Sequence, residues 1–174
     1  SEIEEITKDL RRLVEEIERL NKRVEDENER TAKELRDRVR EAEKKNRKTV
    51  DDIRKLIEDG VRREEIREVI ERDREEVEKV VRDLRDLLRK DRKRVREAVE
   101  TSERLLEDIK RRLEEVDVSD EVRREVDELI KKSRETLKRI ERRSEEVAEE
   151  LERRLRDIKR RSEDMVRELE ERAK

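Results

Sequence analysis

The side chains that could do chemistry in this chain are polar residues set into otherwise apolar helical stripes. They form two trios of one Asn, one Asp and one Ser, namely Asn28, Asp91 and Ser144, and Asn46, Asp73 and Ser162. Their oxygens could coordinate a hard cation, but each trio has one carboxylate, whereas calcium takes about six to eight oxygen ligands, usually from several Asp or Glu residues. The chain has no His and no Cys, so neither serine has a histidine base to activate it. Catalytic residues, cofactors and metals are therefore not expected, and a cation or small-ligand site at the Asp positions is the weaker interpretation.

A structural role accounts for the same trios more simply. Asp accepts hydrogen bonds, Ser donates and accepts, and Asn does both, so each trio can satisfy itself inside a core. A buried polar layer of this kind adds little net stability, but it penalises any helix register in which its members face Leu or Val. We therefore interpret the trios as layers that specify register. Ordinary positions at the boundary of the core are the alternative.

Composition indicates long helices and excludes several kinds of partner. The 174 residues include one Gly, no Pro and no aromatic residue, and 63% of them are charged, which is typical of coiled coils and long helices. The 53 basic and 56 acidic residues alternate closely, so no field is expected to gather nucleic acid or anionic lipid. No uninterrupted apolar run is long enough to span a membrane, and the first residues lack the features of a signal peptide.

Capping signals divide the chain into three helices. Ser1 followed by Glu4 is a capping box, the only glycine, Gly60, is the expected left-handed cap after the first helix, and Ser119 is a good N-cap for the third. The sequence therefore predicts one all-α domain over 1–174, with helices over about 2–58, 63–116 and 120–173.

The apolar stripes repeat every eighteen residues, which is about five turns of a straight α-helix. Asn28 returns as Asn46, Asp73 as Asp91, and Ser144 as Ser162. On this pattern we expect the first stripe to run through Ile3, Ile6, Leu10, Leu13, Ile17, Leu20 and Val24. We expect the second to include Val80, Leu87, Ala98 and Leu105. The helices should be nearly straight.

Short turns require neighbouring helices to be antiparallel, and this predicts which residues share a level. Residue numbers at one level should add to about 119 across the first turn and about 235 across the second. Both polar trios meet this condition on all three helices, and Ser102 with Ser133 meets it across the second turn. Asn21 lies beside the stripe and is expected to be a flanking partner of the layers or a surface residue. The expected fold is a single-chain antiparallel three-helix bundle with buried polar layers.

These features together resemble parametrically designed helical bundles, specifically the untwisted antiparallel three-helix kind. The resemblance covers the whole chain and rests on the repeat, the near-equal helices, the matched polar layers and the Asp, Glu, Lys and Arg surface. It implies a very stable, monomeric scaffold or rigid rod with no natural activity and no partner. Two departures are the polar layers themselves and Arg62, which occupies an N-cap position where Ser or Asp is preferred. Natural spectrin-like repeats are similar in outline, but their core tryptophans are missing here. The alternative is a helical interaction or oligomerisation module whose helices associate between chains.

Overall fold

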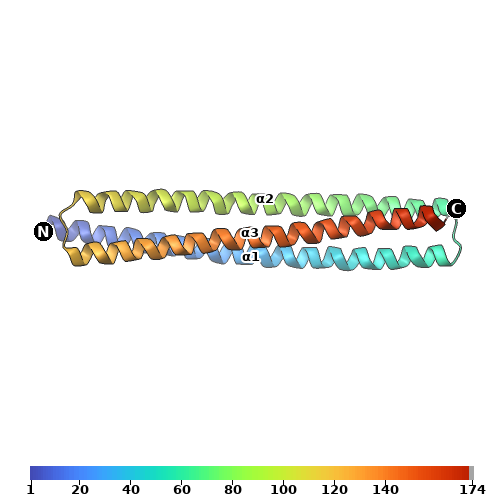
Figure 1. The fold of residues 1–174 in the computed structure, drawn as a ribbon, viewed down its shortest axis with the longest axis horizontal. Coiled ribbons are helices and arrows are strands. Elements are labelled where there is room, and N and C mark those ends of the chain that lie inside the picture. Colours follow the sequence, from blue (N-terminus) through green and yellow to red (C-terminus); the bar gives the residue numbers. More distant parts are fainter. Residues whose placement is uncertain (173–174) are drawn as a thin grey trace. The chain divides into compact units, whose positions relative to one another are not determined.

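Three α-helices make up the computed structural model, which describes residues 1–172 (Figure 1). They are α1 (Glu2–Glu58), α2 (Arg63–Glu115) and α3 (Asp120–Arg172), and the described residues contain no strand. The predicted all-α three-helix bundle is thus confirmed. The second helix ends one residue earlier than predicted, and the predicted end of the third, at residue 173, lies outside the described residues.

The turn between α1 and α2 closes the end of α1 with two backbone hydrogen bonds. The N–H of Val61 donates to the carbonyl of Leu56 (3.1 Å), and the N–H of Gly60 donates to that of Ile57 (3.2 Å). This is the Schellman arrangement, which requires a left-handed residue after the helix. Gly60 has φ of 72°, a conformation that costs glycine little because it has no Cβ.

Serine side chains cap two helix starts. The hydroxyl oxygen of Ser119 accepts a hydrogen bond from the N–H of Val122 (3.3 Å), and its carbonyl accepts one from Arg123 (3.0 Å). At the chain start, the hydroxyl oxygen of Ser1 accepts from the N–H of Glu4 (3.3 Å). Each cap satisfies a backbone donor that would have no partner inside the helix.

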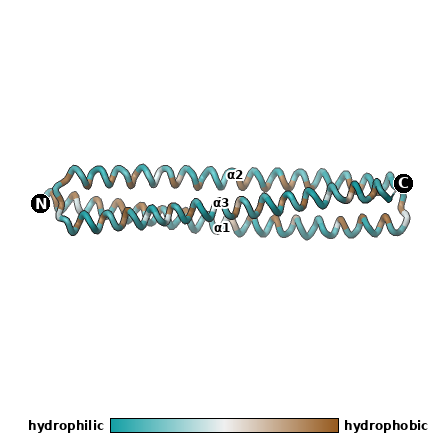
Figure 2. The backbone as a smooth tube through the Cα atoms, viewed as in Figure 1, coloured by the Kyte–Doolittle hydropathy of each residue, from teal (hydrophilic) through white to brown (hydrophobic). Residues whose placement is uncertain are grey.

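The helices pack as two compact units, and each helix contributes to both. The first unit consists of residues 1–31 and 91–146, and the second of residues 32–90 together with the chain from 147 onward. Figure 2 shows the same pattern along every helix, with apolar positions recurring in a mostly hydrophilic chain.

Contacts within the first unit give the directions of its three helical segments. Ser102 bonds Asn21 and Arg94 bonds Thr31, so residue numbers fall along α2 as they rise along α1. Pairs between α1 and α3 instead keep a separation of 114 residues, so these two segments run in the same direction. These pairs are Arg11 with Glu125, Glu25 with Arg139, and Glu29 with Arg143.

The second unit has the same internal directions. Asp73 and Arg85 on α2 contact Ser162 and Glu152 on α3, so the numbers run oppositely along these two segments. Pairs between α1 and α3 lie 114 or 111 residues apart, as in the hydrogen bonds from Arg36 to Glu150 and from Arg154 to Glu43, so these two segments run in the same direction.

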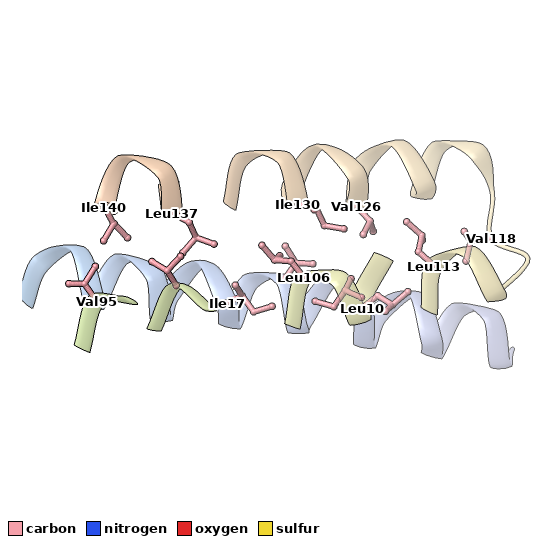
Figure 3. Packing of buried hydrophobic residues seen from close by; sticks show 13 residues of the cluster. Leu10, Ile17, Val95, Leu106, Leu113, Val118, Val126, Ile130, Leu137 and Ile140 are labelled. Carbon is pink, nitrogen blue, oxygen red and sulfur yellow. The ribbon is translucent and has the colours of Figure 1, made fainter. Parts of the chain in front are cut away.

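Apolar side chains from the three segments of the first unit converge on a common interior (Figure 3). The buried members are Leu10, Val14, Ile17, Val95, Val99, Leu106, Ile109, Leu113, Val118, Val126, Ile130, Leu137 and Ile140. Removing such a side chain from water contributes about 1.5–3 kcal/mol, so this interior is the main source of stability. The second unit has two buried clusters, around Leu151 and around Met165.

The expected core stripe is wrong at several positions. On α1, Ile3, Ile6 and Leu20 are exposed, whereas Thr7 and Val14 are buried. The predicted stripe and the stripe that is buried share Leu10 and Ile17. Their other members are neighbours in the sequence, so the spacing of the residues alone does not distinguish the two stripes. A helix in a three-helix bundle contacts two neighbours and needs a wide apolar face, of which only the middle is fully buried.

The same ambiguity affects α2, where two rows of apolar residues, called files below, run side by side along the helix and are offset by one residue in the sequence. Both files repeat every eighteen residues, so the repeat cannot choose between them. The structure buries Val81 and Leu106, while their neighbours Val80 and Leu105 remain 38% and 41% exposed.

Candidate functional site: the buried polar layers

In the second unit, Asp73 and Ser162 form a buried hydrogen bond. The Ser162 hydroxyl donates to Oδ2 of Asp73 at 2.8 Å. Both residues are buried, and the apolar neighbours Ile158 and Met165 on α3 are buried on either side of Ser162 along that helix. Burial raises the pKa of the Asp73 carboxyl, because desolvation disfavours its charged form, and the Ser162 hydrogen bond partly opposes this rise.

Asn46, the third member of this layer, is buried without a hydrogen bond. It is 2% exposed, and neither its Nδ2 nor its Oδ1 has a partner. A small pocket of about 40 Å³ lies beside it, lined among others by Asn46, Asp73 and Val77. The layer therefore combines one satisfied pair with one unsatisfied amide, which costs free energy.

The other trio, Asn28, Asp91 and Ser144, is also buried, within the first unit. Among the described residues, however, no hydrogen bond joins its members to one another. Asp91 Oδ1 instead accepts from Arg94 at 2.8 Å, and the same Arg94 nitrogen donates to Thr31. Hydrogen bonds to an ionised donor are stronger than neutral ones, which explains why the carboxylate turns to the arginine. Burial raises the pKa of Asp91, and the charge of Arg94 opposes this rise.

Ser102 and Ser133, paired by level from the sequence, are both buried in the first unit with a third residue that sequence reasoning missed. The Ser102 hydroxyl donates to Oδ1 of Asn21 at 2.7 Å, and Asn21 is 1% exposed rather than a surface residue. Asn21 Nδ2 and the Ser133 hydroxyl have no partner. A usable signal existed, because Asn21 lies seven residues, about two helical turns, before Asn28 on the same face.

The raised pKa of Asp73 predicts a pH-dependent stability. A folded-state pKa above its ordinary value of 3.8 means that the folded state holds the proton more tightly than the unfolded chain. The stability from this protonation is fully present below the unfolded pKa and is lost as the pH rises through the folded pKa. Wild type should therefore gain stability relative to Asp73→Asn as the pH falls from about 7 to below about 4.

Urea unfolding of both proteins across this pH range measures the effect. Asp83→Asn, which removes one carboxyl from an exposed position of the same helix, is the matched control. A difference between wild type and Asp73→Asn that does not change with pH would contradict the burial of this carboxyl.

Two other kinds of site can be assessed in the described part of the chain. Among residues 1–172, no three His, Cys, Asp or Glu side chains are grouped so that they could hold a metal ion. Within the same residues, no helix combines the length and the apolar character needed to cross a membrane.

Comparisons with known proteins support the fold assignment. No protein-family model matches the chain, and a search of curated proteins finds no match. Among solved structures, the chain is similar to a protein described as a computationally designed three helix bundle, with a TM-score of 0.58 and 18% sequence identity. The match covers 98% of this chain and 90% of that one. At this identity, the similarity establishes a shared three-helix fold.

Proposed function

We propose that the chain is a designed structural scaffold without enzymatic activity, in which buried polar layers specify how the three helices pair. Three features support this: the fold shared with a computationally designed bundle, a sequence in which 63% of residues are charged, and the capped helix ends. A scaffold needs only a defined and stable fold, and the buried hydrogen bonds from Ser162 to Asp73 and from Ser102 to Asn21 help to define one.

The hydrogen bond between Ser162 and Asp73 carries the proposal. If α3 moved by about one turn, Asp73 would face Ile158 or Met165 and lose its donor. A buried carboxylate without a partner is costly, so such a register is strongly disfavoured. The native register has no such penalty at this pair.

Charged residues along α1 and α3 support the same pairing within each unit. The ion pairs between these two helices join one Arg to one Glu, as in Arg11 with Glu125 and Arg36 with Glu150. Exposed ion pairs add little stability. A shift of α3 by one turn would place Glu25 beside Glu135 but Arg36 beside Glu146, so these ion pairs contribute less to the choice of register than the buried hydrogen bond does.

We further propose that the chain is a monomer. Light scattering should give a mass of 21.5 kDa that does not change with protein concentration. The alternative, an oligomerisation module, is favoured by Leu20 and Leu105, which are 47% and 41% exposed in the first unit. A mass of at least twice the monomer value, reduced to one chain by Leu20→Lys with Leu105→Lys, would establish that alternative.

A further inference from the structure

The pattern of Arg–Glu pairs between α1 and α3 is interrupted at Arg47 and Arg161. At a separation of 114 residues, Glu29 pairs with Arg143 through their side chains. Eighteen residues further along both helices, the same separation brings Arg47 opposite Arg161. Both arginines line one pocket, at the position where a Glu and an Arg pair in the preceding repeat.

The second unit has an open pocket at this position. Its volume is about 370 Å³, and its lining includes Arg47, Arg54 and Arg161 above the apolar side chains of Val50 and Met165. Nη1 of Arg161 is buried without a hydrogen-bond partner. Among the described residues, Arg47 makes no ion pair, so two guanidinium groups at this pocket have donors to offer.

The acidic residues at the same pocket do not neutralise these donors. Asp164 is bound by Arg167 at 2.6 Å, and Glu168 lies 3.5 Å from both Arg54 and Arg172. Asp51 is exposed on α1 and makes no ion pair with Arg47 among the described contacts. Buried donors without acceptors are costly, so an anion here would relieve the Arg161 side chain.

We propose that this pocket binds a small tetrahedral oxyanion, such as inorganic phosphate or sulfate, between Arg47 and Arg161. The guanidinium group presents its N–H donors in a planar fork that matches two oxygens of such an anion. The anion supplies the acceptors that Glu29 provides to Arg143 in the preceding repeat. This inference is independent of the scaffold function.

Arg47→Glu tests the site by restoring the pattern of opposite charges. The variant places a carboxylate opposite Arg161, as Glu29 lies opposite Arg143, so the fold should be retained and the donors occupied. Losing one charged hydrogen-bonding partner and gaining a negative charge should weaken binding by on the order of tenfold or more. Arg30→Glu, an exposed change of the same charge on α1 away from the pocket, is the matched control.

Titrations with sodium sulfate and with sodium phosphate, followed by calorimetry and by thermal unfolding, are compared with sodium chloride at equal ionic strength. Wild type and Arg30→Glu should bind both oxyanions and melt at a higher temperature in them than in chloride. Arg47→Glu should bind them more weakly and keep only the smaller rise in melting temperature that sulfate and phosphate give any fold. Equal effects of sulfate, phosphate and chloride on wild type would overturn the proposal. Unchanged oxyanion binding by Arg47→Glu would overturn it as well.

Discussion

Leu106→Ala should lower the free energy of unfolding by about 2–5 kcal/mol, whereas Leu105→Ala should lower it by less than about 1 kcal/mol. The two residues are adjacent and identical in type, but Leu106 is fully buried among the apolar side chains of the first unit and Leu105 is 41% exposed. Truncating Leu106 removes buried methyl groups and leaves a cavity, while truncating Leu105 removes contacts that water already reaches.

Urea unfolding of the two variants at one temperature makes the comparison, and each serves as the control for the other. The pair also decides which of the two apolar files on α2 faces the core. Equal losses, or a larger loss for Leu105→Ala, would mean that α2 is rotated relative to its neighbours and that the packing of the first unit is different.

Asn46→Leu should raise the free energy of unfolding by roughly 1–3 kcal/mol. Asn46 is buried with both amide atoms unpaired, so the wild type bears the desolvation cost of this group without a compensating hydrogen bond. Leucine is similar in size and apolar, and the pocket of about 40 Å³ beside Asn46 gives it room.

Asn21→Leu is the informative comparison for that prediction. Asn21 is equally buried, but its Oδ1 accepts the Ser102 hydroxyl at 2.7 Å, so its removal leaves Ser102 without this acceptor. This change should be clearly less favourable than Asn46→Leu, by about 1 kcal/mol. Chemical unfolding measures both, and a loss of stability for Asn46→Leu would show that its amide is satisfied in the folded protein.

Much of the fold could be predicted because the strongest signals were local. The Ser1 and Ser119 caps, the single Gly60 and the absence of proline place the helix ends within a residue of those in the structure where the described residues extend. These features act through backbone groups a few residues away, so they do not depend on tertiary packing.

The choice of buried face was harder, because it depends on which neighbours a helix meets. Leu105 and Leu106 are both leucines in repeating files, and only the positions of α1 and α3 decide which one is buried. Polar residues in the core made the buried face harder to predict. Thr7 and Asn21 occupy core positions that an apolar search passes over, while the apolar Ile6 and Leu20 remain exposed.

The sequence predicted which residues belong to the candidate site better than it predicted the hydrogen bonds between them. Residue level groups Asp73 with Ser162 and Asp91 with Ser144, yet only the first pair is bonded. The difference arises from Arg94, three residues after Asp91, which offers that carboxylate a charged donor at the edge of the core. Such competition depends on side-chain conformations rather than on position along the helix.

The most direct test of the account is a crystal structure that places the side chains of Asn46, Asp73 and Ser162. We expect all three to be buried at one level, with the Ser162 hydroxyl donating to Asp73 at about the 2.8 Å found here. Asp73 and Ser162 at different levels, or with side chains turned to solvent, would contradict the claim that buried polar layers specify how these helices pair.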